Sequence, residues 1–362
     1  MKYGRIYNFS SGPAMMPEPV LEEIRDEMLN YQGTGMCVME MSHRSEEYRT
    51  IAAQTEKDLR SLMDVPSNYR ILFLQGGGTL EFAAVPINLM KNGKAVYIET
   101  GSWSVKAATE AKRYGSVIIG ASSKDKNFTY VPDCSDLDIP EDTDYVYICE
   151  NETIHGVTWN KLPNTKGKVL VTDQSSMFLS KPCNVSDYGL IWAGVQKNLG
   201  PAGMAVVIIR EDLIREDIHP QAPTYLRFDT HAKTNSGYNT PNTWSMYCCG
   251  KVIRYLMNNG GLEAQAKRNE EKAKVLYDYL DSSKLFYNPV EKSVRSLMNI
   301  PFVTGDKDQE ATVIKEAKEA GLKALAGHPS VGGLRASLYN AMPKEGAQAL
   351  VSFLKDFEKK TL

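Results

Sequence analysis

Short apolar runs alternate with amphipathic stretches along the first 210 residues of the chain. The runs are apolar at consecutive positions, which is typical of strands buried on both faces of a parallel sheet. The stretches between them, at 80–90 and 103–114, have the length and pattern of helices. This alternation predicts an α/β fold with a mostly parallel sheet covered by helices. Strands are expected at 70–75, 95–98, 116–119, 145–149, 168–172, 189–192 and 205–209.

The pattern changes after Pro241. Helices are expected there at 243–257, 262–280, 309–320 and 345–359, with one apolar segment at 297–302. The sequence NNGG at 258–261 stops the first of these helices, because glycine favours the end of a helix. We therefore expect a smaller α+β domain after residue 259. Periodicity does not place the first sixteen residues.

Composition narrows the class of protein. The chain has 362 residues, 42% of them hydrophobic and 24% charged, as in ordinary soluble globular proteins. At about 100–200 residues per domain, two or three domains are expected. Lys and Arg total 42 against 44 Asp and Glu, a formal net charge of −2. Nucleic-acid binders usually carry a basic excess, so no nucleic-acid partner is expected.

The cysteines and the apolar runs indicate the cellular compartment of the protein. Six cysteines are scattered without a CxxC pair or a histidine at ligand spacing, so we expect reduced thiols and no metal site. The longest apolar run, 204–209, is far shorter than the ~20 residues of a membrane helix. The first nineteen residues lack the apolar core of a signal peptide. These features predict a cytoplasmic protein without a membrane partner.

A glycine-rich turn, QGGGTLEF at 75–82, follows one predicted strand and opens a helix. Such a turn presents backbone N–H groups and the positive helix end to an anion. The turn matches neither GxGxxG nor a Walker A motif. A plain strand-to-helix turn is therefore an equally good interpretation of this segment alone.

Three further residues are expected at the same edge of the sheet. Trp103 follows one strand, Asp173 ends another, and Lys197 lies just past a third. Each has an ordinary alternative, because Asp173 suits a turn before Ser175 and most lysines are solvated surface charges. Together with the glycine-rich turn they fit pyridoxal 5′-phosphate. The lysine would form a Schiff base, the carboxylate would pair with the pyridinium nitrogen, and the aromatic ring would stack on the cofactor.

The chain also resembles a known family, the phosphoserine aminotransferases, which are fold-type I pyridoxal-phosphate enzymes of aminotransferase class V. The similarity covers essentially the whole chain and rests on several motifs in order. The resemblance implies a large cofactor domain at 17–259 and a small domain formed by 1–16 and 260–362. The motifs are NFSSGPA at 8–14, MSHR at 41–44, VPSNY at 65–69, NET at 151–153, QKN at 196–198, GPAG at 200–203 and GGLRASLYN at 332–340.

The resemblance implies roles around the cofactor ring. Lys197 would form the Schiff base and then move a proton as general acid–base. Asp173 would hold the pyridinium nitrogen protonated, Trp103 would stack on the ring, and Thr153 would hydrogen-bond the phenolic oxygen.

The resemblance also implies how the cofactor phosphate is held. Gly78, Thr79 and Gln196 would bind it from one subunit. Asn239 and Thr240 would reach it from the second subunit, so a homodimer with shared active sites is expected.

The substrate residues implied by the resemblance are cationic. Arg335 would clamp the α-carboxylate. His43, Arg44 and His328 would receive the distal anion, either the phosphate of phosphoserine or the side-chain carboxylate of glutamate. Many family members have Arg where this chain has Pro329, so one cation is missing from that pocket.

The resemblance assigns no role to three other charged residues. Lys233 and Arg227 are further cations that the sequence does not place. Glu81 stands where glutamine is frequent in the family, and we expect it to point away from the cofactor phosphate.

The expected function is interconversion of O-phospho-L-serine plus 2-oxoglutarate with 3-phosphohydroxypyruvate plus L-glutamate in serine biosynthesis. The resemblance also allows 4-phosphohydroxythreonine in vitamin B6 synthesis. One alternative is a related aminotransferase that uses serine or alanine, and Pro329 is the feature that favours it. Two others are a nucleotide-binding module or dehydrogenase built on the glycine-rich turn, and a catalytically inactive relative.

Overall fold

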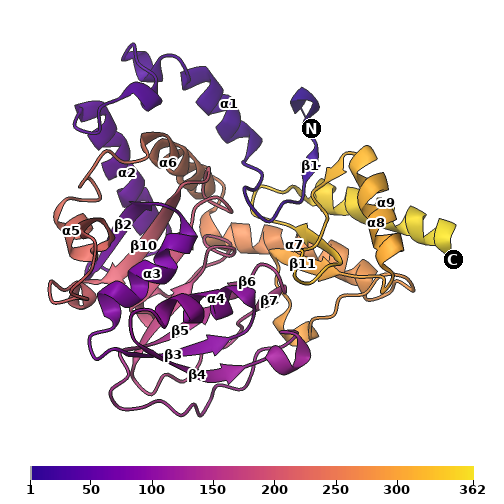
Figure 1. Cartoon of the computed structure of the whole chain (residues 1–362). Helices are drawn as coiled ribbons and strands as arrows, with labels where there is room; N and C mark the ends of the chain where they lie inside the picture. The colour runs from indigo at the N-terminus through magenta and orange to yellow at the C-terminus, as the bar shows by residue number, and fades with distance from the viewer. Residues whose placement is uncertain (1) are drawn as a thin grey trace.

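The computed structural model describes residues 2–362 and is built around a seven-stranded sheet (Figure 1). The strand order is β2-β10-β9-β8-β5-β3-β4. Strand β10 runs antiparallel to both of its neighbours, and the other adjacent pairs are parallel. The predicted α/β fold with a mostly parallel sheet is confirmed. The strands are β2 Tyr69–Gln75, β3 Lys94–Glu99, β4 Ser116–Ser122, β5 Tyr145–Cys149, β8 Val169–Asp173, β9 Leu190–Gly194 and β10 Met204–Arg210.

Helices cover both faces of this sheet, because successive strand residues point to opposite sides. Ile71 and Phe73 face the core under α2 (Glu46–Leu62) and α6 (Thr243–Asn258). Leu72 and Leu74 face the core under α3 (Gly78–Leu89) and α4 (Ser102–Ala111). Burial on both faces explains why the strands are continuously apolar in the sequence. Two shorter helices, α1 (Glu18–Glu27) and α5 (Phe228–Lys233), complete this part of the chain.

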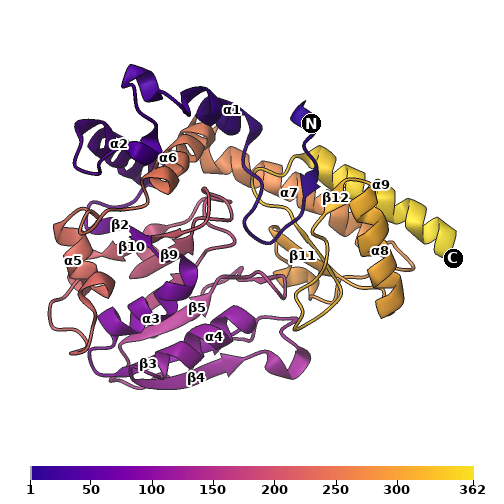
Figure 2. The same cartoon turned by 45° about the horizontal axis from the view of Figure 1, so that its top comes forward.

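The C-terminal region has its own core, seen beside the large sheet in Figure 2. Phe9 and Met15, from the N-terminal segment, are buried in this same core. The division into 17–259 and 1–16 plus 260–362 remains a proposal, which this separate core supports. The elements of this region are α7 Gly261–Leu280, α8 Lys307–Glu319 and α9 Lys344–Thr361, the antiparallel pair β11 Asn299–Phe302 and β13 Leu334–Ser337, and the parallel pair β1 Tyr7–Asn8 and β12 Leu322–Lys323.

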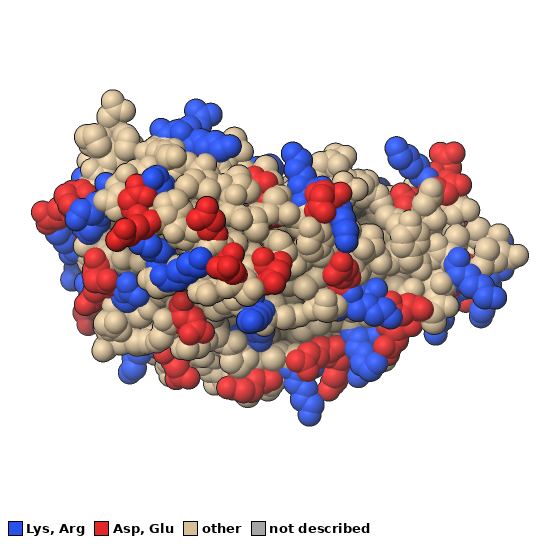
Figure 3. All heavy atoms as spheres, turned by 90° about the horizontal axis from the view of Figure 1, so that it is seen from below, with Lys and Arg blue, Asp and Glu red and all other residues tan. Residues whose placement is uncertain are grey.

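A small hairpin of β6 (Asn151–Glu152) and β7 (Val157–Thr158) follows β5. Acidic and basic side chains are interspersed on the face shown in Figure 3, in keeping with a net charge near zero. Within residues 2–362, no helix is both long enough and apolar enough to cross a membrane.

Candidate active site

A cavity of about 350 Å³ opens where the parallel strands of the large sheet end. We call it the cofactor cavity. It brings together seven residues predicted from the sequence, although they come from five separate segments of the chain. These residues are Gly78, Thr79, Trp103, Thr153, Asp173, Gln196 and Lys197.

Lys197 is buried at this cavity and is not a solvated surface charge. Its Nζ donates a hydrogen bond of 2.7 Å to Oγ1 of Thr153. The N-terminal loop closes beside it, since the Ala14 amide donates to the carbonyl of Gln196 at 2.9 Å. In that loop Gly12 has φ +133°, a conformation that glycine adopts readily. The loop therefore holds the lysine in a site largely shielded from water.

Asp173 ends β8 and is buried beside Lys197 in the cavity wall. One carboxylate oxygen accepts a 2.8 Å hydrogen bond from the Ser175 amide. Within residues 2–362, the other oxygen has only the Cys149 thiol as a partner, at 3.9 Å. Burial raises the pKa of Asp173, and the Ser175 hydrogen bonds and the Lys197 charge oppose that effect. Asp173 thus forms the turn that the sequence also suggested, and keeps one oxygen for a ligand N–H group.

The glycine-rich turn leaves the start of α3 free for an anion. Gly76 and Gly77 have φ values of +102° and +68°, which side-chain-bearing residues rarely adopt. A Cβ atom on Gly78 would lie 2.9 Å from the Trp192 ring. Among the described residues, no side chain caps the helix at this end. The unpaired amides and the helix dipole therefore favour a phosphate here.

Trp103 lies in the first turn of α4 and presents its ring to the same cavity. The indole Nε1 is buried and has no hydrogen-bond partner within residues 2–362. Lys106, one turn further along α4, places its Nζ 4.4 Å from the centre of this ring. The spacing of three residues on a helix is the signal that could have indicated Lys106 from the sequence.

Arg335 lies on β13 of the C-terminal region and contacts Thr153, a residue of the cavity wall, without lining the cavity itself. It is buried, and its Nη1 is 3.5 Å from the Thr153 carbonyl oxygen that accepts from it. Its buried Nε has no hydrogen-bond partner within the described chain. Burial lowers the pKa of His328, and the nearby positive charges of Arg335 and Lys106 lower it further. The positive charges of Arg335 and Lys106 therefore lie near His328, and Lys106 also lies against the Trp103 ring.

The other predicted ligand residues do not reach the cofactor cavity within one chain. His43 and Arg44 line a second cavity of about 450 Å³, with Gln75 in its wall. Asn239 and Thr240 are exposed. The Gln75 side-chain amide donates to the Thr240 carbonyl oxygen at 2.6 Å. These four residues thus lie together, apart from Lys197.

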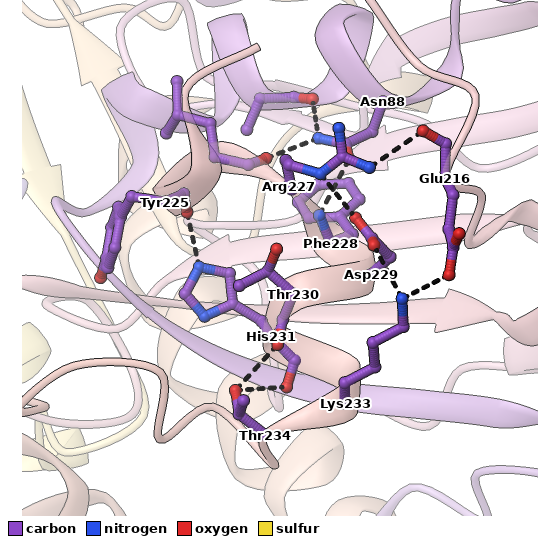
Figure 4. A network of polar contacts seen from close by, with 12 residues as sticks. Asn88, Glu216, Tyr225, Arg227, Phe228, Asp229, Thr230, His231, Lys233 and Thr234 are labelled. Atoms are coloured by element: carbon purple, nitrogen blue, oxygen red, sulfur yellow. Dashed lines mark hydrogen bonds and ion pairs between the residues drawn. The ribbon is translucent and has the colours of Figure 1, made fainter.

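Two remaining cations are already paired. Arg227 donates from Nε to Asp229 Oδ1 at 3.0 Å, and Lys233 contacts Asp229 Oδ2 at 3.3 Å. Lys233 also pairs with Glu216, as Figure 4 shows. Neither charge is free to receive a substrate phosphate.

Glu81 does not line the cofactor cavity, as expected. It is fully buried, and burial raises its pKa to about 8. It therefore brings little negative charge to the cofactor phosphate at neutral pH.

Comparison with known proteins agrees with this geometry. The family model for Aminotransferase class-V matches residues 6–350. The chain belongs to the class-V aminotransferase family. This aminotransferase is 51% identical to the phosphoserine aminotransferase of Nitrosomonas europaea, over 98% of this chain and 99% of the relative. It is 50% identical to that of Acidithiobacillus ferrooxidans, over 98% of both chains. The sequence resemblance to phosphoserine aminotransferases is thus confirmed.

Solved structures give the same result for this aminotransferase. It aligns with the phosphoserine aminotransferase of Bacillus circulans subsp. alkalophilus at a TM-score of 0.96 and 40% identity, covering 99% of each chain. The pyridoxal-phosphate-bound enzyme of Trichomonas vaginalis aligns at 0.93 and 38% identity, over 97% of this chain and 100% of that one. The cofactor of the family is pyridoxal 5′-phosphate. The buried lysine, the half-satisfied Asp173 and the uncapped start of α3 fit that group.

Proposed function

We propose that this aminotransferase interconverts O-phospho-L-serine plus 2-oxoglutarate with 3-phosphohydroxypyruvate plus L-glutamate, in L-serine biosynthesis. The observation that carries the proposal is the meeting of Lys197 and Asp173 in one buried cavity. Arg335 contacts Thr153 in its wall, and the positive charges of Arg335 and Lys106 lie near His328. The first pair suits cofactor chemistry on an amino acid. The cations suit a substrate with an anion at each end.

Bound in the cavity, pyridoxal phosphate supplies an aldehyde and an electron-accepting ring. Lys197 Nζ would take the proton from the α-carbon of the amino acid and deliver it to the C4′ atom of the cofactor, and would move a proton in the opposite direction in the second half-reaction. Thr153 Oγ1, at 2.7 Å from Nζ, holds the amine inside the cavity. The buried Asp173 carboxylate would hold a proton on the ring nitrogen through its free oxygen. Ser175 fixes the orientation of that carboxylate.

Arg335 would orient the substrate. Its guanidinium is planar and can bind the α-carboxylate with two parallel hydrogen bonds. The unpartnered buried Nε leaves a donor available for that anion. Every amino-acid substrate carries this carboxylate, so Arg335 would serve both halves of the reaction.

Many family members have an arginine at the position of Pro329. We propose that Lys106 supplies part of the positive charge that this arginine would provide. Lys106 makes no ion pair with a carboxylate within residues 2–362 and lies beside the Trp103 ring. It also lies close enough to His328 to lower the pKa of that imidazole. A phosphorylated substrate, including 4-phosphohydroxythreonine, is therefore favoured over serine or alanine.

The protein is proposed to act as a homodimer with shared active sites. His43, Arg44, Asn239 and Thr240 are grouped away from the Lys197 of their own chain. These residues can bind the phosphate groups predicted for them if each chain contributes them to the cofactor cavity of its partner. We further propose a cytoplasmic location, because all six cysteines, which lie within residues 2–362, are unpaired thiols.

Substrate competition tests the proposed reaction. Phosphoserine should donate its amino group to 2-oxoglutarate with a much higher kcat/KM than serine or alanine. Equal or better use of serine or alanine would support the alternative aminotransferase and exclude the phosphorylated substrate. Tight nicotinamide-cofactor binding without transamination would support the dehydrogenase alternative.

A further inference from the structure

A buried carboxylate outside the cofactor cavity holds the helix that carries Trp103. Glu152, on strand β6, is completely buried and does not line the cavity. Its Oε2 accepts from the Trp103 amide at 3.1 Å. Its Oε1 accepts from the Ser104 amide at 2.9 Å and from the Ser104 hydroxyl at 2.6 Å. The carboxylate therefore satisfies the first free amides of α4.

The start of α4 is built to receive this carboxylate. The residue before the helix is Gly101, which has no side chain to cap it. A Cβ atom on Gly101 would lie 2.3 Å from the Glu152 carboxyl carbon. Glu152 therefore occupies the space where a serine or aspartate cap would normally lie. The cap comes from another part of the chain, nearly fifty residues away.

The same glutamate is joined to both groups that surround the reacting lysine. On one side its carboxylate fixes the backbone of Trp103. On the other, it directly precedes Thr153, whose hydroxyl accepts the hydrogen bond from Lys197 Nζ. In the part of the chain that the structure describes, the Trp103 ring has no hydrogen-bond partner, and Phe82 is 6.3 Å from it between ring centres. Its position thus depends on where the first turn of α4 lies.

We propose that Glu152 is a positioning residue, which sets the Trp103 ring and the Thr153 hydroxyl for the cofactor by capping α4. The inference rests on the proposed function. Burial raises the pKa of Glu152 to about 7, and the donors of Ser104 and Trp103 oppose that effect. A negative carboxylate at a helix start is also favoured by the helix dipole.

Cofactor binding to the apoprotein tests this proposal with a readout other than turnover. Glu152→Gln keeps the size of the side chain but places an amide N–H₂ against N–H donors. Gly101→Ala leaves Glu152 in the chain but displaces its carboxylate. Both variants should raise the Kd for pyridoxal phosphate by about 10-fold, a loss typical of charged hydrogen bonds. Titration of the apoprotein with the cofactor, followed by absorbance and tryptophan fluorescence, gives this Kd.

A remote helix cap provides the matched control. Asp306 caps α8 by accepting from the amides of Asp308 at 2.8 Å and Gln309 at 3.2 Å. Asp306→Ala, which removes the accepting oxygen, should lower the melting temperature but leave the cofactor Kd within about twofold of wild type. A change in Kd as large as that in Glu152→Gln would make the effect one of general stability and overturn the proposal.

A double-mutant cycle with Trp103→Ala isolates the positioning effect. When the ring is absent, Glu152→Gln should change the Kd much less than it does in the wild-type background. Equal effects in both backgrounds would show that Glu152 does not act through Trp103. If wild-type apoprotein fails to bind pyridoxal phosphate, the proposed function itself is wrong. Normal wild-type binding with an unchanged Kd in both Glu152→Gln and Gly101→Ala overturns only this inference.

Discussion

The side-chain nitrogen of Lys197 donates a 2.7 Å hydrogen bond to the hydroxyl of Thr153, inside a buried cavity that also contains Asp173. This contact links Lys197, which lies just past the end of β9, to the hairpin of β6 and β7, which follows β5. It holds the amine at the wall of the cofactor cavity. Most of the proposed chemistry depends on that placement.

Replacing the lysine should abolish transamination. Lys197→Ala removes both the amine that binds the cofactor and the group that moves the proton, so kcat should fall by at least about 10²–10⁴-fold. Lys274→Ala, on the exposed side of α7, is a matched control and should keep normal turnover. Steady-state rates with phosphoserine and 2-oxoglutarate measure both. Near-normal turnover of Lys197→Ala would refute the assignment.

Mixed dimers test whether the active sites are shared. Lys197→Ala and Arg44→Ala should each be strongly impaired. If Arg44 serves the partner's cavity, refolding them together should restore about one quarter of the wild-type activity, because half of the dimers are mixed and each has one intact site. Activity that stays at the level of the separate variants would place Arg44 in its own chain's site.

The cations near His328 should control the affinity for a phosphorylated substrate. Lys106→Ala should raise the KM for phosphoserine by about 10-fold and that for glutamate less, because a doubly charged phosphate gains more from each cation. Pro329→Arg should shift the KM ratio in the opposite direction. Arg335→Gln is the control, since it should raise both KM values together. An unchanged KM ratio in both Lys106→Ala and Pro329→Arg would show that other groups bind the phosphate.

Glu81 should make stability depend on pH. Its pKa is raised to about 8 in the folded protein from 4.5 in the unfolded chain. The folded state therefore binds more protons than the unfolded state between these values, and stability should fall as the pH rises through that window. The slope from one such group is at most about 1.4 kcal/mol per pH unit. Glu81→Gln should flatten the decline in urea-unfolding free energy between pH 5 and 8, and an unchanged slope would contradict the assignment.

The sequence predicted the large sheet because each strand is continuously apolar. It also predicted the meeting of Asp173 and Lys197, since β8 and β9 are neighbouring parallel strands, Asp173 ends β8 and Lys197 lies just past the end of β9. Local patterns could not place Phe9, because its burial depends on helices more than 250 residues away. Nor could they show that Glu152 caps α4, since Gly101 carries no capping side chain and the contact is long-range.

The central claim is that Lys197 binds pyridoxal phosphate and that phosphoserine donates its amino group to it. The visible absorbance of the purified protein tests this directly when O-phospho-L-serine is added without any keto acid. We expect a yellow band from the lysine–cofactor Schiff base that fades on addition of phosphoserine and returns with 2-oxoglutarate. A band that fades with glutamate but not with phosphoserine would contradict the substrate, and no band even after adding the cofactor would contradict the mechanism.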